Sequence, residues 1–318
     1  MEITKSTSRM LLAAAIILLL TTKVFLASRL DLYSDEIFYW LASTRLSLAY
    51  SDLPFVTSLL VWLGTNLDPG NPLAVRVLFI VLGSSIPLLV FWLAQPITGR
   101  GQALFSAFLS LCIPLGGFLG LLAVPDVPLL FFGLLAIGFF ERALRTDLNR
   151  YWLATGIAVA LGLSTHYRFF LYPAAAVLFL LCYGPARKTL QNPKLWMAIA
   201  ISALGLTPII WFNLSNQLAS ASFYLVERHP WEFQPRGLLH IFIQAGLVSP
   251  PLYGLLGLTL WQMITRARAG DQNAAMLASF ALTNLLVYMI LAPWTDSAST
   301  TIHWPLSGYF PLLVFAPA

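Results

Sequence analysis

The sequence predicts an all-α protein that crosses a membrane several times. Hydrophobic residues make up 58% of the chain and the mean hydropathy is +0.79, whereas soluble domains are roughly 45–50% apolar. Charged residues make up only 10%. Apolar runs of about the ~20 residues that a spanning helix needs recur along the chain. These observations exclude a single soluble domain and predict a polytopic transmembrane helical bundle.

The first spanning helix is predicted at Met10 to Ser28, after a short basic tail. No small-residue cleavage site follows this run, so we interpret it as a retained helix rather than a removed signal peptide. Residues 29–74 then form a long polar and aromatic loop on the outer side of the membrane. We expect two amphipathic interfacial helices in this loop, at 36–46 and 55–67.

Eight further apolar runs are predicted to span or enter the membrane. The pair at 151–165 and 169–184 is short, so it forms either a tight hairpin or two partly buried spans. The last apolar run, 305–318, is too short to span comfortably, and we expect a truncated tenth helix there. The whole chain, 1–318, is predicted to be one transmembrane domain. The eight runs lie at 75–95, 102–123, 127–144, 151–165, 169–184, 195–213, 236–263 and 275–293.

The distribution of Lys and Arg predicts the orientation. With the N-terminus in the cytoplasm, eleven of the 18 basic residues fall on the inner side, as the positive-inside rule requires. Most acidic residues then fall on the outer side, so we expect any chemistry to face away from the cytoplasm. The eleven are Lys5, Arg9, Arg100, Arg142, Arg145, Arg150, Arg187, Lys188, Lys194, Arg266 and Arg268.

Composition also limits the classes of partner. The two cysteines, Cys112 and Cys182, lie in apolar runs without a CxxC or CxxH spacing, so they predict neither a disulfide framework nor a zinc site. The net charge of +5 is explained by the cytoplasmic loops and does not indicate a nucleic-acid partner.

An adjacent acid pair, Asp35 and Glu36, opens the first outer loop just before the apolar run Ile37–Leu41. One interpretation is structural: Ser34 or Asp35 caps a helix and Glu36 complements its dipole. The other is chemical: one carboxylate at a helix start beside the membrane acts as a general base on an acceptor hydroxyl. The pair alone does not separate the two.

Five more polar residues are expected on the same outer side. Asp126 lies between prolines, a pattern also typical of a turn. His166 and Arg168 lie between two spans, where an arginine could equally reach lipid headgroups. Arg228 lies in an aromatic-rich loop, and His303, which could be merely solvated, lies at the mouth of the last apolar run. Together they could surround a cavity for an anionic lipid headgroup, because guanidinium groups bind phosphate oxygens in a bidentate way.

Several segments resemble a known family in the same order. The chain reads Ser34-Asp35-Glu36-Ile-Phe-Tyr39-Trp40 and then Tyr50-Ser-Asp52-Leu-Pro54. It continues with Ala123-Val-Pro-Asp126, Thr165-His166-Tyr167, Pro208-Ile-Ile-Trp211-Phe-Asn213 and His303-Trp304-Pro305. This set resembles the GT-C superfamily of glycosyltransferases, in the branch related to dolichyl-phosphate-mannose protein mannosyltransferases and the lipid A aminoarabinose transferase.

The resemblance implies a GT-C-like bundle in the plasma or inner membrane, with its active site on the outer or periplasmic side. Such enzymes move a sugar, with inversion, from a polyprenyl-phosphate donor to a lipid, glycan or protein acceptor. It implies that Asp35, with Glu36 beside it, is the catalytic base. No metal ligands and no cofactor are assigned, but a divalent cation near Asp35 is possible, because some relatives bind one near the acidic loop. The expected substrate-binding residues are Tyr39, Tyr50, Asp52, Asp126, His166, Tyr167, Arg168, Arg228 and His303.

The chain departs from the family pattern where relatives often have Ser-Lys-Tyr, because it has Thr165-His166-Tyr167. A neutral imidazole is a weaker phosphate partner than lysine, and Arg168 is a candidate replacement. Relatives are also usually longer. Two alternatives therefore stay open: a non-catalytic protein that binds or transports polyprenyl phosphate, and an inactive truncated transferase.

Overall fold

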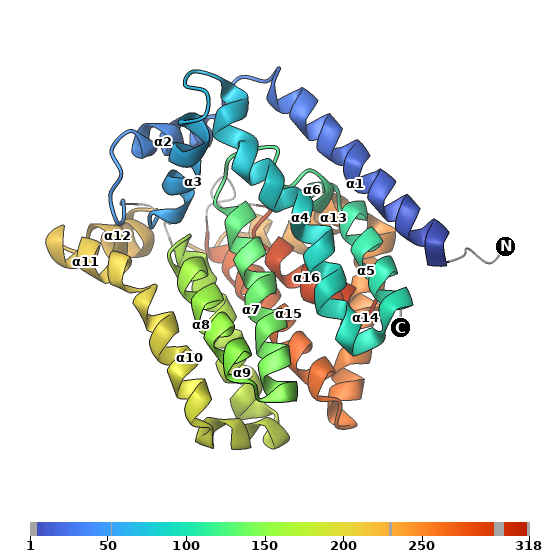
Figure 1. Cartoon of the computed structure of the whole chain (residues 1–318). Helices are drawn as coiled ribbons and strands as arrows, with labels where there is room; N and C mark the ends of the chain where they lie inside the picture. Colours follow the sequence, from blue (N-terminus) through green and yellow to red (C-terminus); the bar gives the residue numbers. More distant parts are fainter. Residues whose placement is uncertain (1–4, 52, 229–230, 296–301, 317–318) are drawn as a thin grey trace.

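The computed structural model describes residues 5–51, 53–228, 231–295 and 302–316. Within these ranges the chain is helical, with no strand and one isolated β-bridge between Ala49 and Pro54. The helices form a bundle, and the loop 29–74, with α2 and α3, lies at one end of it (Figure 1). The predicted fold class, an all-α polytopic bundle, is confirmed.

The N-terminal quarter follows the prediction closely. Helix α1 (Lys5–Ala27) runs along the side of the bundle and is followed by α2 (Ser34–Ser43), α3 (Val56–Thr65) and α4 (Pro72–Thr98). The two predicted interfacial helices correspond to α2 and α3. Because α2 packs on α3 and α3 on α4, the loop 29–74 is attached to the end of a long apolar helix.

The predicted span at 102–123 is not one continuous helix, because helix α5 (Arg100–Cys112) ends before the run does. Pro114 begins the short helix α6 (Pro114–Gly117), and Gly120 has a φ of 94°, which no helix accommodates. The segment that follows continues along α4 without helical structure and leads to the start of α7. A Cβ added at Gly83 would lie 2.0 Å from the Leu119 carbonyl oxygen, and one at Gly120 would lie 2.2 Å from that of Phe79. Only glycine allows the two backbones to approach this closely.

Helix α7 (Asp126–Thr146) is the central spanning helix, and it begins at one of the predicted site residues. It packs on α8 (Asn149–Leu163) and on α4. The helices on either side of the predicted 165–168 turn have different main partners, since α8 packs on α7 and α10, whereas α9 (Leu171–Cys182) packs on α15. They therefore do not form the tight hairpin that was one of the two expectations. The 3₁₀ helices η1 (Tyr167–Phe170) and η2 (Gly184–Gln191) flank α9.

Two other predicted spans are bent. The run at 195–213 is divided into α10 (Pro193–Leu204) and α11 (Thr207–Ser215) with a bend of 40°, and the run at 236–263 bends by 110° between α13 (His240–Val248) and α14 (Pro250–Arg268). The second break occurs at Ser249, whose φ is 78°, before two prolines. The remaining elements are α12 (Ala219–Ser222), the π-helical turn η3 (Phe223–Glu227), η4 (Pro235–Leu239), α15 (Gln272–Leu291), η5 (Ala292–Trp294) and α16 (Leu306–Leu313).

Within the described ranges, four helices are long and apolar enough to cross a membrane, or up to seven if each bent pair counts as one span. This is fewer than the nine complete runs that the sequence predicts. Helices α5 and α8 are too short to count, and three spans are bent: α10 with α11, α13 with α14, and α9 with η2. The chain is a multi-pass membrane protein. The short last helix, α16, is buried against α15.

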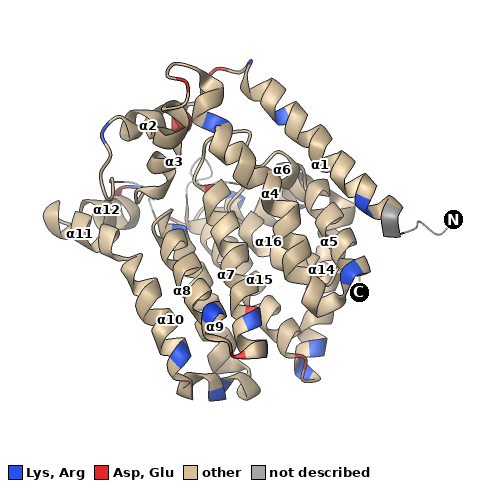
Figure 2. Ribbon diagram, viewed as in Figure 1, with Lys and Arg blue, Asp and Glu red and all other residues tan. Residues whose placement is uncertain are grey.

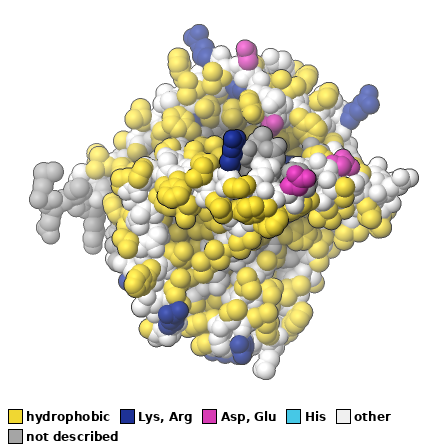
Figure 3. Space-filling model, turned by 180° about the vertical axis from the view of Figure 1, so that it is seen from behind, with side chains coloured by type: hydrophobic (Ala, Val, Ile, Leu, Met, Phe, Trp, Pro, Cys, Tyr) yellow, Lys and Arg dark blue, Asp and Glu magenta, His cyan; other side chains and the backbone are white. Residues whose placement is uncertain are grey.

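Charge is divided between the two ends of the bundle. Most Lys and Arg residues lie at the end opposite α2, whereas α2 and the start of α7 hold acidic residues (Figure 2). Hydrophobic side chains cover most of the surface between these ends (Figure 3). An apolar belt with charged ends fits a hydrocarbon layer.

Candidate active site

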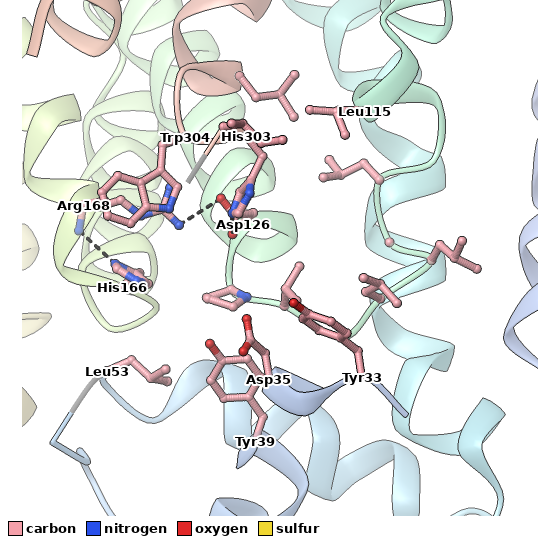
Figure 4. A pocket seen from close by; sticks show the side chains of 18 of the residues that line it. Tyr33, Asp35, Tyr39, Leu53, Leu115, Asp126, His166, Arg168, His303 and Trp304 are labelled. Atoms are coloured by element: carbon pink, nitrogen blue, oxygen red, sulfur yellow. Dashed lines mark hydrogen bonds and ion pairs between the residues drawn. The ribbon is translucent and has the colours of Figure 1, made fainter. Parts of the chain in front are cut away.

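A cavity of about 870 Å³ lies between α2, the start of α7 and the segment before α16. Asp35 and Tyr39 point into it from α2, and Asp126, His303 and Trp304 lie on the opposite wall (Figure 4). A third side is apolar. It is built from the segment that follows α5 and includes Leu115, Phe118, Leu119, Leu121 and Leu122.

Asp126 is the centre of the polar wall. One of its oxygens accepts a hydrogen bond of 2.8 Å from Arg168 Nη2, and the other lies 3.1 Å from His303 Nε2. The side chains of Asp126 and Arg168 are only 12% and 10% exposed, so this ion pair is largely shielded from water. Trp304 lies over Arg168, with the guanidinium carbon 4.7 Å from the ring centroid. Arg168 is therefore not the headgroup-facing anchor that was one interpretation of its sequence position.

Arg228 provides a second cation in the cavity. Its guanidinium carbon lies 5.4 Å from the ring centroids of both Tyr224 and Trp304, a distance suited to cation–π attraction. No described carboxylate forms an ion pair with it. Its hydrogen-bond donors are thus available to an anionic ligand.

His166 is buried and borders the cavity. Its Nδ1 accepts a hydrogen bond from the backbone N–H of Arg168, so the proton of the neutral ring is on Nε2. Burial, and then the charge of Arg168, lowers the pKa of His166 well below its ordinary value. The ring is therefore a neutral hydrogen-bond donor at neutral pH and not a second phosphate-neutralising cation.

The two carboxylates of the acidic pair have different environments. Asp35 is exposed and lines the cavity, whereas Glu36 is fully buried, pairs with Arg76 and does not reach the cavity. Tyr39 lies beside Asp35 in the cavity wall, and burial raises its pKa, so its hydroxyl remains protonated. The N-cap of α2 is Tyr33, rather than Ser34 or Asp35 as the structural interpretation proposed.

Other predicted substrate-binding residues lie elsewhere. The Tyr50 hydroxyl donates to the Ala42 carbonyl oxygen and accepts from the Ser47 N–H, so it stabilises the loop after α2 and does not line the cavity. Tyr167 packs edge-on against Tyr224 behind the cavity wall. Asp52 lies outside the described residues.

Three further residues of interest, Arg76, Tyr33 and Tyr224, are not among the predicted site residues. Arg76 could have been recognised, because a charged residue inside an apolar span normally has a specific partner. Tyr33 and Tyr224 carried no such signal and are identified by their place in the cavity wall.

The described residues do not fit a metal site. No three His, Cys, Asp or Glu side chains within the described ranges gather closely enough to hold an ion. Near Asp35, the other cavity carboxylate is that of Asp126, and both of its oxygens already have partners. We therefore derive no step through a metal, and a divalent cation near Asp35 stays a prediction.

Comparisons with known proteins support the fold. The chain is 23% identical over 285 residues to the lipid A galacturonosyltransferase RgtD of Rhizobium johnstonii, a match covering 88% of this chain and 58% of that protein. The structure of ArnT from Cupriavidus metallidurans bound to undecaprenyl phosphate matches with a TM-score of 0.77 at 15% identity, over 99% of this chain and 60% of that one. The archaeal oligosaccharyltransferase AglB from Archaeoglobus fulgidus, in complex with an inhibitory peptide and a dolichol-phosphate, matches with a TM-score of 0.57 at 11% identity, over 96% of this chain and 50% of that one.

The chain thus spans somewhat more than half the length of these relatives. The model of one family, described as dolichyl-phosphate-mannose-protein mannosyltransferase, matches residues 52–212, about half of the chain. This chain belongs to the dolichyl-phosphate-mannose-protein mannosyltransferase family, within the GT-C superfamily of glycosyltransferases.

Proposed function

We propose that the protein transfers a sugar from a polyprenyl-phosphate donor to a hydroxyl group of a lipid, glycan or protein acceptor, with inversion at the anomeric carbon. The observation that carries this proposal is that the cavity has an acidic side, a cationic side and an apolar side. The Asp35 carboxylate faces a wall that contains Arg168, Arg228 and His303, and an apolar side joins the two. A sugar phosphate on a hydrocarbon chain has the same three chemical parts.

The donor phosphate is assigned to the cationic wall. Arg228 is the main phosphate ligand, since Arg168 is already neutralised by Asp126. His166 offers an uncharged Nε2–H to an oxygen of the donor. The leucines and Phe118 of the apolar side contact the first isoprene units.

The reaction needs one base and no enzyme nucleophile. The acceptor oxygen attacks the anomeric carbon from the Asp35 side, while the bond between that carbon and the phosphate oxygen breaks. The acceptor proton passes to Asp35, and the electron pair of the broken bond leaves with polyprenyl phosphate. Positive charge that develops on the sugar ring is stabilised by the nearby carboxylate, much as in glycoside hydrolysis.

The charge distribution supports an active site on the outer side of the membrane. The end rich in Lys and Arg is assigned to the cytoplasm, so the cavity opens on the outer side of a plasma or inner membrane. The relative that acts on lipid A supports a lipid acceptor in particular.

The test is release of polyprenyl phosphate from a labelled undecaprenyl-phosphate sugar by the purified protein. The acceptor is supplied as a membrane lipid extract, because its identity is open. Asp35→Asn is expected to reduce release by on the order of 10²- to 10⁴-fold, the usual contribution of a general base, and to leave binding of undecaprenyl phosphate unchanged. Asp31→Asn is the matched control in the same loop and should retain activity.

Two outcomes contradict the proposal in different ways. Normal turnover by Asp35→Asn would show that another group is the base. Tight binding of undecaprenyl phosphate by a wild-type protein that never releases it from the labelled donor would favour the non-catalytic carrier protein.

A further inference from the structure

Asp35 and Asp126 come from distant parts of the chain, yet both line the same cavity. Asp35 is at the start of α2 in the outer loop, and Asp126 is at the start of the spanning helix α7. Helix α2 itself packs on α3 rather than on α7. Some other contact must therefore set the distance between the two carboxylates.

That contact begins at Arg76, which is fully buried near the start of α4. Its Nε and Nη2 donate to the two oxygens of Glu36 at 2.8 and 2.6 Å. The other donors bond to backbone oxygens at the end of α1 and just after it: Ala27 at 2.9 Å, Leu30 at 2.8 Å and Asp31 at 2.8 Å. A guanidinium group has five N–H donors, and all five are used.

Both carboxylate oxygens of Glu36 also have all their hydrogen-bond partners. Besides the two bonds from Arg76, its Oε1 accepts from the backbone N–H of Ala123 at 2.8 Å, and its Oε2 accepts from that of Tyr33 at 2.9 Å. Burial alone would raise the pKa of Glu36, but the hydrogen bonds from Arg76, Ala123 and Tyr33 lower it below its ordinary value. The carboxylate therefore stays charged, with no lone pair left for a substrate.

The partners of Glu36 lie close to the two cavity acids in the sequence. Glu36 is the residue next to Asp35, and Ala123 is three residues before Asp126. One buried carboxylate thus joins the backbone that bears the first acid to the backbone that bears the second, and Arg76 fixes both to α1 and α4.

We infer that Glu36 and Arg76 are positioning residues that hold Asp35 and Asp126 at the separation which sugar transfer requires. This inference rests on the proposed function. A well-packed apolar pair could stabilise the fold as well as a buried ion pair does, but it could not direct hydrogen bonds to Ala123 and Tyr33. Placement matters because an error of about 1 Å in a catalytic group can cost on the order of 10²-fold in rate.

Glu36→Gln is the main test, since glutamine keeps the shape of the side chain but removes the charge and one acceptor. We expect kcat to fall on the order of 10- to 100-fold, with the KM for the donor and the affinity for undecaprenyl phosphate within about threefold of wild type. Arg76→Lys keeps the charge but cannot supply five donors in one plane, so it should show the same split between kcat and KM.

Glu141→Gln is the matched control. Glu141 is also a fully buried glutamate in an ion pair, with Arg145, but it lies in α7 far from the cavity. Its replacement should lower thermal stability and leave kcat unchanged, so a loss of kcat in Glu36→Gln would not be a general effect of destabilisation. All assays are run well below the unfolding temperature of each variant.

The outcomes separate this inference from the proposed function. A normal kcat in Glu36→Gln, together with an inactive Asp35→Asn, would overturn the positioning role and leave the reaction intact. If the wild-type protein shows no transfer, the positioning role of Glu36 is tested by amide hydrogen exchange instead. Faster exchange of the Ala123 and Tyr33 amides in Glu36→Gln than in Glu141→Gln would support the link between the two segments, and equal exchange would refute it.

Discussion

Nε2 of His303 lies 3.1 Å from Oδ2 of Asp126, although 177 residues separate the two in the sequence. Because Arg168 occupies the other oxygen of Asp126, this carboxylate has a cationic or hydrogen-bonding partner on each side. Asp126 therefore orders the cavity wall, and in the proposed reaction the acceptor proton passes to Asp35 and not to Asp126. The division of roles between the two acids suggests several experiments.

Asp126→Asn should destabilise the protein and abolish transfer. The substitution leaves the buried guanidinium of Arg168 without its counterion, a change that typically costs about 3–5 kcal/mol. Thermal unfolding in detergent measures the loss. Asp147→Asn is the control, because its pair with Lys194 is 56% exposed on the aspartate side. The asparagine oxygen can still accept the hydrogen bonds from Trp152 and Asn192, so the loss should be small. Equal stability losses in the two variants would contradict the assigned burial.

Arg228→Ala should weaken donor binding more than it slows the chemical step. Arg228 is the cavity cation that no described carboxylate neutralises, and hydrogen bonds to charged groups contribute about 1.5–3 kcal/mol. The expected rise in the KM for the labelled donor is therefore on the order of 10- to 100-fold, with partial recovery in Arg228→Lys. Arg236→Ala provides the comparison, because Arg236 is eight positions from Arg228 in the sequence but is exposed and outside the cavity. An unchanged KM for Arg228→Ala would remove this residue from the donor site.

The buried His166 predicts a specific dependence of stability on pH. Its pKa is lowered in the folded state, so below about pH 6.5 the unfolded chain binds a proton that the folded chain does not. This contribution to stability is complete above that pH and is lost as the pH falls, by at most about 1.4 kcal/mol per pH unit. Unfolding midpoints of wild type and His166→Gln at pH 7.5 and 5.5 should therefore converge at the lower pH. Parallel pH curves would show that His166 is not held neutral.

The close approach of Gly120 to α4 predicts that this position tolerates no side chain. Gly120→Ala would place a Cβ 2.2 Å from the Phe79 carbonyl oxygen at a φ of 94°. The apolar wall of the cavity must then move, with a loss of more than about 1 kcal/mol in stability and weaker binding of undecaprenyl phosphate. Gly257→Ala, in the interior of α14 with no atom near its added Cβ, should be neutral or stabilising. A fully stable Gly120→Ala protein would disprove the tight contact.

Local patterns in the sequence predicted the helices of the outer loop, the start of α7 and the concentration of polar residues on one side. These features depend on residues that are neighbours in the chain. The bends were harder to predict, because Pro114 and the prolines after Ser249 lie in runs whose hydropathy alone is high enough for a span. Hydropathy reports how well a segment dissolves in lipid and is insensitive to a change of direction.

The partners of the acids could not be predicted from neighbouring residues. The sequence treats Asp35 and Glu36 as one motif, but consecutive helix positions point about 100° apart, so Asp35 faces the cavity and Glu36 faces the interior. In the interior, Glu36 pairs with Arg76, which lies forty positions later in the sequence. Which acid meets which base depends on the packing of α1, α2 and α4, and only the folded chain specifies it.

The open guanidinium of Arg228 also affects how turnover would end. On the proposed reaction, the donor is a phosphodiester with a single negative charge, whereas the spent carrier is a monoester with a charge of about −1.5 to −2 at pH 7. A wall of fixed cations attracts the spent carrier more strongly than the loaded one. In the proposed reaction the spent carrier would therefore bind more tightly than the donor, and added undecaprenyl phosphate would compete with the donor for the cavity.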